Sequence, residues 1–398
     1  MTASPETPPS DQKSCIVFCP SAALFPREKP HRTLMQSLYG MLLGYIHCLA
    51  GLANAPGSRP FVSVKELSAI VKILIDSGTG ASVLATLTSA EGSSYRRPGA
   101  RLLITNDGKR LGSISGGCLE EDVVARARTV MSTGRAEIVI YDTTTENDLV
   151  WGVGLGCHGV VKVLIEKLPS RPAWAVTLAE NFAARSSTLL AVLHETANPA
   201  QLGTRIASGS GDPVTATASG GVFLNVVPPP TSLVIFGAGD DAQPLASLAH
   251  ELGWHITIAD PRPAFATAAR FPNADRLLIA PAAELVDRAA PDAATLAVVM
   301  THHYLHDVPL LRALLTLPLA YLGLLGPRKR AEKILSDLAA EGVAVTDAAR
   351  ARLHAPVGLD LGADSPEQVA LAIVAEIQAV LTGRDARPLR ERARPIHE

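Results

Sequence analysis

A glycine-rich turn between a strand-like run and a helical pattern is the feature that most constrains the fold of this 398-residue chain. Ser232–Phe236 predicts a buried strand, and Gly237-Ala238-Gly239-Asp240-Asp241-Ala242 follows it in the G-x-G-x-x-A form of the dinucleotide fingerprint. The first glycine permits the tight turn, Gly239 lets an anion approach the backbone, and Ala242 allows close packing of helix on strand. The pattern predicts a Rossmann-like domain.

Short apolar runs separated by helical patterns continue beyond this turn, which is the alternation typical of a doubly wound parallel sheet. The expected strands are His255–Ala259, Arg276–Ile279, Leu296–Met300 and Ala320–Leu324, and a last helix runs from Pro366 to about Leu381. Upstream, Pro228-Pro229-Pro230 disfavours both helix and central strand, as a linker would. We therefore expect an extension at 1–60, a first domain at 61–227, a linker at 228–231, the Rossmann-like domain at 232–385 and a tail at 386–398.

The first domain has the pattern of an α+β fold. Helices are expected at Val64–Ile75 and from Leu119 to about Met131, and strands at Ser82–Thr88, Arg101–Asn106, Leu111–Ile114, Glu137–Tyr141 and Val160–Ile165. Residues 174–227 add two strand-like runs, Thr188–His194 and Gly221–Val226, whose order the pattern leaves open. We interpret them as an extension of the first domain.

Charge and cysteine content exclude several classes of protein. The formal net charge of −2 offers no excess of cations for a phosphate backbone, so a nucleic-acid partner is not expected. The five cysteines lack the paired spacings of a zinc site or a disulfide framework. The apolar stretch Leu38–Ala53 is short for a membrane span, and MTASPETPPS carries no positive charge of an export signal. We expect a cytoplasmic protein that does not enter a membrane.

Two loops of the first domain have the chemistry to hold an anion. Ser94, Arg96 and Arg97 offer hydroxyl and guanidinium donors between two strands, although a surface turn would have the same composition. Ser115, Gly116 and Gly117 precede a helix, so their backbone N–H groups are predicted to cradle a phosphate.

Two cysteines lie in glycine-rich loops of the same domain. Cys118 begins a helix, where the helix dipole favours thiolate, and Cys157 follows Gly156 in Gly154-Leu155-Gly156-Cys157-His158-Gly159. Thiolates are suitable ligands for a sulfur-rich metal cofactor, so Cys118 or Cys157 is a candidate neighbour of the metal. The alternative is that both thiols are inert and buried.

The Rossmann-like domain contains a second set of candidate binding residues. Gly237 and Gly239 are placed to meet a pyrophosphate, and Asp260 ends the next strand, where a ribose partner belongs. Two aspartates beside the glycines would repel that pyrophosphate, so NAD(P) is a doubtful ligand. His302, which follows another strand in Thr301-His302-His303-Tyr304-Leu305-His306-Asp307, is expected to contact a ligand together with Asp307.

The motifs together resemble those of the xanthine dehydrogenase accessory family, also called the XdhC/CoxI family. The segments that carry the resemblance are GSSYRRPGARLLIT, GSISGGCLEEDVV, GLGCHG, VIFGAGDDAQPLA, ADPRPAFATAARFP, VMTHHYLHD, YLGLLGPRKRA and LHAPVGLDLGADSPEQVALAIVAEI. They follow the family's order from about Val64 to Leu381. This chain departs from the family at His158, often glycine, at Asp240, often histidine, and in residues 1–60, which match nothing in it.

The resemblance implies a maturation factor. Such proteins bind the molybdenum cofactor (molybdopterin), protect it while a cysteine desulfurase supplies the terminal sulfido ligand, and deliver it to an apo molybdenum hydroxylase of the xanthine dehydrogenase type. Turnover is not required for that role, and a homodimer is compatible with it. The rival hypothesis is an NAD(P)-dependent oxidoreductase that uses the C-terminal domain, although no Tyr-x-x-x-Lys hydride-transfer motif accompanies the fingerprint. A third alternative, a regulatory scaffold, leaves the two thiol loops without a purpose.

Overall fold

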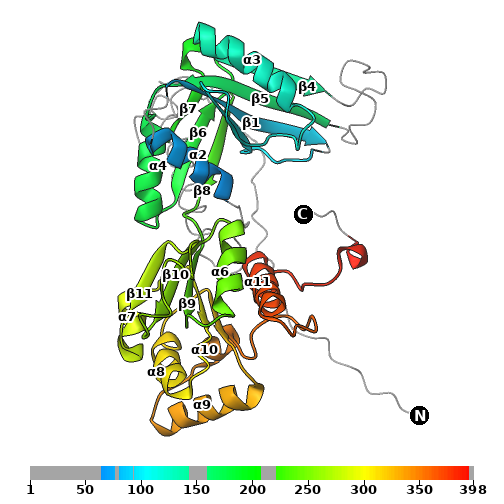
Figure 1. Cartoon of the computed structure of the whole chain (residues 1–398). Coiled ribbons are helices and arrows are strands. Elements are labelled where there is room, and N and C mark those ends of the chain that lie inside the picture. The colour runs from blue at the N-terminus through cyan, green and yellow to red at the C-terminus, as the bar shows by residue number, and fades with distance from the viewer. Residues whose placement is uncertain (1–63, 77–79, 93, 143–158, 208–220, 394–398) are drawn as a thin grey trace, which may run out of the picture. The chain divides into compact units, whose positions relative to one another are not determined.

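The structure is a computed structural model, and it describes residues 64–76, 80–92, 94–142, 159–207 and 221–393 (Figure 1). An N-terminal and a C-terminal region each build their own sheets and core within this part of the chain, and each is described by itself. The predicted fold class, an α+β region followed by a Rossmann-like parallel sheet, is confirmed.

The N-terminal region is built on a five-stranded antiparallel sheet. Its strands are β1 (Ser82–Gly92), β2 (Arg101–Thr105), β3 (Arg110–Gly112), β4 (Glu137–Asp142) and β5 (Gly159–Leu168). They lie in the order β3-β2-β1-β5-β4. Helix α3 (Glu120–Thr133) packs on one face because Val123, Ala127 and Val130 recur at helical spacing and are buried there. Helix α2 (Lys65–Asp76) packs its apolar residues on the other face.

A smaller sheet shares the core of this region. It consists of β6 (Thr188–Leu193), β7 (Gly203–Ile206) and β8 (Val222–Val227), in the order β7-β6-β8, and helix α4 (Ala173–Ala183) packs beside it. Trp174 and Leu178 are buried with Leu84 of the larger sheet and Leu190 of the smaller one. The sequence pattern missed α4 and β7, because α4 has few polar residues to show a period and β7 is only four residues long.

Two buried charged side chains connect the sheets. Arg101, 3% exposed, donates from Nη2 to Oδ1 of Asn225 on β8 at 3.2 Å. Glu166 on β5, also buried, accepts from the backbone N of Thr204 on β7 at 3.0 Å. Burial lowers the pKa of Arg101 to about 10 and raises the pKa of Glu166. The arginine two residues after Gly99 therefore has a structural role between the sheets.

The C-terminal region contains six parallel strands. They are β9 (Ser232–Phe236), β10 (His255–Asp260), β11 (Arg276–Ile279), β12 (Thr295–Val299), β13 (Tyr321–Leu324) and β14 (Leu353–His354). The order β11-β10-β9-β12-β13-β14 is the doubly wound order, with β9 at the centre, where the chain reverses its direction of winding. The five strands predicted from the sequence are confirmed. The two-residue strand β14 was not predicted, because only its pairing with β13 makes it a strand.

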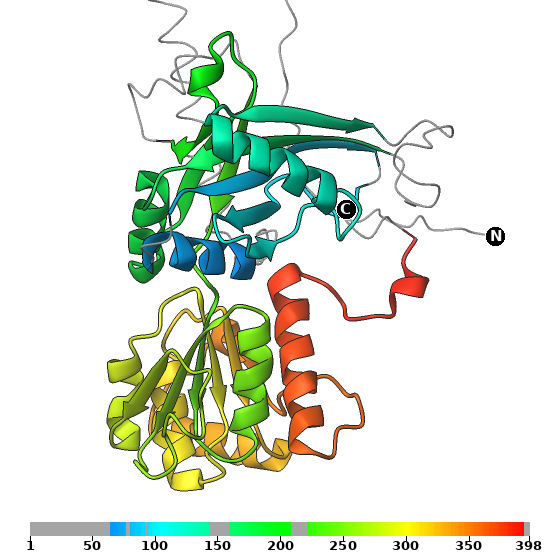
Figure 2. The same ribbon diagram turned by 45° about the horizontal axis from the view of Figure 1, so that its top comes forward.

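Helices cover both faces of this sheet. On one face lie α6 (Ala242–Glu251) and α11 (Pro366–Thr382), which run side by side in both ribbon views (Figure 2). On the other face lie α7 (Leu285–Ala289), α8 (Tyr304–Leu314), α9 (Arg328–Ala340) and α10 (Asp347–Arg352). Side chains of β9 alternate between the two layers, Ile235 facing the first and Phe236 the second. Among the described residues no helix is long and apolar enough to cross a membrane.

Candidate functional site

The loop between β3 and α3 is closed around a carboxylate of the chain itself. Glu120 accepts five hydrogen bonds: on Oε1 from Ser113 Oγ (2.9 Å), Ile114 N (3.1 Å) and Ser115 N (2.9 Å), and on Oε2 from Gly117 N (2.8 Å) and the Ser115 hydroxyl. The loop turns this tightly because Gly116 and Gly117 adopt φ of 78° and 122°. Of the backbone N–H groups that the sequence predicted for a phosphate, those of Ser115 and Gly117 bond instead to Glu120, and that of Gly116 bonds to the hydroxyl oxygen of Ser113.

The charge of Glu120 is strongly stabilised in this loop. Burial by itself would raise the pKa of the carboxyl group, but the hydrogen bonds from Ser115 and Ser113 outweigh burial and lower the pKa to about 2. A second anion at the same N–H groups would meet this negative charge. The backbone N–H groups of Ser115 and Gly117 are therefore already bonded, and the residues that this loop exposes are Gly116, Gly117 and Cys118.

The loop that contains Ser94, Arg96 and Arg97 lies against Gly116. A Cβ atom on Gly116 would approach the Tyr95 ring to 2.5 Å, so the two predicted loops are in direct contact. The Arg96 guanidinium donates to both oxygens of Glu66 on α2, at 3.0 and 2.6 Å.

The contacts of Arg96 with Glu66 and of Tyr95 with Gly116 hold this loop in place. The Ser94 hydroxyl donates to the carbonyl of Arg96 at 2.8 Å, whereas Arg97 is exposed. Arg96 therefore positions the loop, and Arg97 is the arginine of the pair that faces outward.

An exposed surface results, which we call the thiol face and define as Tyr95, Arg97, Gly116, Gly117 and Cys118. Tyr95 is 69% exposed, and the free thiol of Cys118 is exposed next to the two glycines. A Cβ on Gly117 would meet no atom within 4 Å among the described residues, so this glycine borders open space. The thiol face joins a soft ligand, an aromatic ring and a cation, and the predicted Gly156 and Cys157 lie outside the described residues.

The glycine turn after β9 has the expected backbone, but a side chain lies where a pyrophosphate was expected. A Cβ on Gly237, whose φ is 120°, would collide with the carbonyl oxygen of Met300 at 2.5 Å, so this glycine allows the loops after β9 and β12 to approach each other. A Cβ on Gly239 would lie 2.7 Å from Oδ1 of Asp241. The space beside the second glycine, where a pyrophosphate would lie, is therefore partly filled by a side chain of the loop.

Asp260, the predicted ribose partner, points into the protein. It is 1% exposed and accepts hydrogen bonds from the backbone N of Ala238 (2.7 Å) and from N, Nε and Nη2 of Arg262 (2.8, 2.9 and 2.9 Å). Burial opposes ionisation of this carboxyl group, but the bonds from Arg262 and Ala238 prevail and lower its pKa. In this arrangement Asp260 ties the glycine loop to the end of β10.

The two aspartates after the glycines have cationic or polar partners. Asp240 accepts from Arg270 Nη2 at 2.6 Å, and Arg270 also donates to the carbonyl of Ala238. Asp241 lies 2.6 Å from Nε2 of His302, which belongs to the loop after β12. The repulsion expected from the sequence is thereby reduced, because Arg270 neutralises one of the two charges.

The histidine-rich segment after β12 divides into exposed and structural residues. His302 is exposed and has φ of 58°, a conformation that its contact with Asp241 helps to hold. Asp307, for which we expected ligand contact, is 1% exposed and accepts from the Thr301 hydroxyl and from Arg330. Both partners of Asp307 belong to the chain, and its side chain is not accessible to a ligand in this structure.

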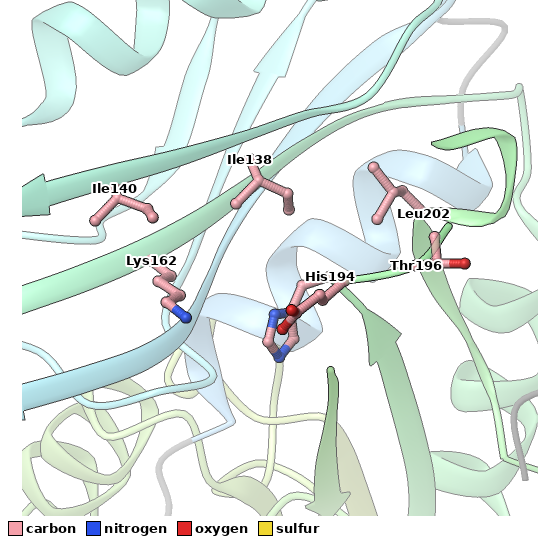
Figure 3. Close-up of a pocket in the computed structure, with 7 residues that line it drawn as sticks. Ile138, Ile140, Lys162, His194, Thr196 and Leu202 are labelled. Carbon is pink, nitrogen blue, oxygen red and sulfur yellow. The ribbon is translucent and has the colours of Figure 1, made fainter. Parts of the chain in front are cut away.

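A shallow pocket lies on the N-terminal region, and none of the candidate site residues predicted from the sequence lines it (Figure 3). It is lined by Ile138, Ile140, Lys162, His194, Glu195, Thr196 and Leu202. Burial and the nearby Lys162 lower the pKa of His194. Within the described ranges, no group of three His, Cys, Asp or Glu side chains is arranged to hold a metal ion.

Four residues of these two sites were missed in the sequence: Tyr95, Glu120, Arg262 and Arg270. A signal existed for two of them, since Glu120 stands in the first turn of the helix after Gly116 and Gly117, and Arg262 stands two residues after Asp260. Nothing local marks Arg270, which reaches Asp240 from 30 residues away.

Comparisons with known proteins agree with this division of the chain. The model of the XdhC and CoxI family matches residues 77–142, and that of the XdhC Rossmann domain matches residues 233–377. The chain is 33% identical over 313 residues to a protein of Bacillus subtilis named as a probable component of xanthine dehydrogenase, covering 74% of this chain and 92% of the relative. It is 28% identical over 310 residues to the molybdenum cofactor insertion chaperone PaoD of Escherichia coli, covering 76% and 84%.

A solved structure has the same fold. The crystal structure of a xanthine dehydrogenase from Bacillus halodurans superposes with a TM-score of 0.68 at 29% identity. The match covers 83% of this chain and 99% of that chain, so it includes both regions.

Proposed function

The chain belongs to the XdhC and CoxI family, and from this premise we propose that it is a maturation factor that binds the molybdenum cofactor and inserts it into a molybdenum hydroxylase of the xanthine dehydrogenase type. Two relatives support the proposal, one named as a probable component of xanthine dehydrogenase and the other as a molybdenum cofactor insertion chaperone. In this role the cofactor is cargo, held while a cysteine desulfurase supplies its sulfido ligand and then passed to the apo-hydroxylase.

One observation carries the assignment of the binding surface: the loop closed around Glu120 exposes the Cys118 thiol two residues after Gly116, against which the exposed Tyr95 ring lies. The cofactor is a flat pterin with a dithiolene that carries the metal and a phosphate tail. The Tyr95 ring offers a stacking surface for the pterin, and the thiol offers a soft ligand near the metal. Arg97 is an exposed cation for the phosphate.

The internal carboxylate makes this surface suited to transfer. Because Glu120 and the hydroxyl of Ser113 occupy the N–H groups of Ser115, Gly116 and Gly117, the phosphate is held by exposed side chains and not by a buried cradle. Exposed charge pairs contribute on the order of 1 kcal/mol or less, so a grip of this kind releases its cargo readily. Cys157, Gly156 and Ser94 remain proposed members of the site, and catalysis by this chain is not required.

The test is cofactor retention. Wild-type protein and the Cys118→Ala and Tyr95→Ala variants are loaded with molybdenum cofactor, desalted and oxidised, and the fluorescent pterin is measured per mole of protein. We expect each variant to retain at least fivefold less pterin with an unchanged circular dichroism spectrum, since both side chains are exposed. Ser132→Ala, at the opposite end of α3, is the matched control.

Retention equal to the wild type in both variants would remove the thiol face from the proposal. Transfer is measured separately, as activity recovered by an apo-hydroxylase mixed with the loaded protein. No recovery with loaded wild-type protein would exclude the insertion role.

A further inference from the structure

The end of β10 in the C-terminal region carries two arginines on one exposed aromatic ring. The guanidinium carbon of Arg262 lies 3.9 Å from the centre of the Phe265 ring, and that of Arg270 lies 5.0 Å from it. Phe265 is 38% exposed and the side chain of Arg262 is 43% exposed. This group, which we call the arginine platform, lies beside the glycine loop, because Arg270 also bonds to the carbonyl of Ala238.

The platform stands where Rossmann domains distinguish their nucleotides. An acid at the end of the second strand binds the free 2′-hydroxyl of a ribose, whereas a nearby arginine accommodates a 2′-phosphate. Here the acid, Asp260, is 1% exposed and already accepts four hydrogen bonds from the chain. A ribose hydroxyl would have to replace at least one of them.

Arg262, unlike Asp260, has a hydrogen-bonding group left for a ligand. Arg262 uses Nε and Nη2 to hold Asp260, which fixes the plane of its guanidinium, and its Nη1 makes no hydrogen bond to any residue that the structure describes. A fixed guanidinium stacked on an aromatic ring suits both an oxyanion at its edge and a planar base on its face. Arg270 neutralises Asp240 close by, so a phosphate would not face an unpaired carboxylate there.

From this arrangement we propose that the arginine platform is a binding site for a 2′-phosphorylated adenosine nucleotide, with the 2′-phosphate on Arg262 and the base stacked on the platform. The site differs from the thiol face in position and ligand. Asp241 lies beside Gly239, in the space of a pyrophosphate, so the adenosine half is the part that fits without rearrangement. The best probe is therefore 2′,5′-ADP, compared with 5′-AMP, and NADP⁺ compared with NAD⁺ is the second pair.

The experiment is a calorimetric titration of the full chain with each probe. We expect 2′,5′-ADP to bind at least tenfold more tightly than 5′-AMP, and NADP⁺ to bind more tightly than NAD⁺. Equal affinities within either pair, a preference for the unphosphorylated member, or no binding of 2′,5′-ADP at millimolar concentration would each overturn the proposal. This comparison uses wild-type protein, so it does not depend on a variant that folds.

Variants then locate the phosphate. Arg262→Lys keeps a cation beside the buried Asp260 but loses the planar guanidinium group. We expect this variant to bind 2′,5′-ADP at least fivefold more weakly than the wild type, with a smaller loss of affinity for 5′-AMP. Arg276→Ala, which removes another exposed arginine at the amino end of the edge strand β11, where it bonds to the carbonyl of Arg288, is the control and should leave both affinities unchanged. An equal loss for both nucleotides in Arg262→Lys would mean that the arginine does not contact a 2′-phosphate. Loss of cofactor binding at the thiol face would leave these results unaffected.

Discussion

Replacing Glu120 by glutamine tests whether the loop under the thiol face depends on an internal negative charge. Glutamine has the same shape, but its amide lacks the charge and places its NH2 group against the backbone N–H of either Ser115 or Gly117, whose bonds go to different oxygens of Glu120. The pKa of Glu120 is lowered from its ordinary value of 4.5 to about 2 in the folded protein. At about 1.36 kcal/mol per pH unit this difference corresponds to a ceiling of about 3 kcal/mol. Because the loop is partly exposed, solvent screening reduces the expected contribution to about 1–2 kcal/mol.

The pH dependence follows from the direction of the pKa change. A carboxyl group whose pKa is lowered by folding stabilises the protein above its unfolded pKa, and this stabilisation is lost as the pH falls through the folded value. Wild type should therefore exceed Glu120→Gln in free energy of unfolding at pH 7, and the difference should shrink as the pH falls from about 5 towards 2. Urea denaturation of both proteins at several pH values measures it.

A neighbouring residue supplies the matched control. Glu121 is 79% exposed and pairs only with Arg110 among the described residues, so Glu121→Gln should leave the stability close to that of the wild type. A loss that is equal at pH 7 and at pH 3, or equal in the two variants, would refute the reasoning about Glu120.

Two further predictions concern the loops of the two regions. Gly116→Ala and Gly117→Ala both place a side chain at positive φ, at a cost on the order of 1 kcal/mol or more, and only Gly116→Ala must also displace the Tyr95 ring. Gly116→Ala should therefore reduce pterin retention, measured per mole of folded protein, well below that of Gly117→Ala, and equal retention would contradict the contact. Asp307→Asn should lower the free energy of unfolding by about 3 kcal/mol, because it leaves the guanidinium of Arg330 without its counter-charge. Lys329→Ala, at an exposed position, should change the free energy of unfolding little, and chemical denaturation of both variants measures the difference.

Patterns within short segments of the sequence predicted most strands of the fold, but not β7 or β14. Each of the strands β9, β10, β11, β12 and β13 is a run of apolar residues between turn signals, and the fingerprint could be placed between β9 and α6 because the turn chemistry is local. The composition of the loops at Ser94 and Gly116 identified both as candidate binding loops, but the sequence did not predict that they contact each other. Exposure of the Cys118 thiol likewise agrees with its position before a helix.

Only the tertiary structure decided what each polar side chain faces. Glu120 lies only five residues after Ser115, but the two glycines must fold the loop back before the carboxylate reaches the backbone N–H of Ser115 in the predicted phosphate cradle. Asp260 was placed correctly at the end of a strand and Asp241 in the turn before a helix, yet their partners Ala238 and His302 lie in the loops after β9 and β12. A pattern of residues specifies which element forms, whereas the partner of a charge depends on which elements pack together, and that is a property of the whole fold.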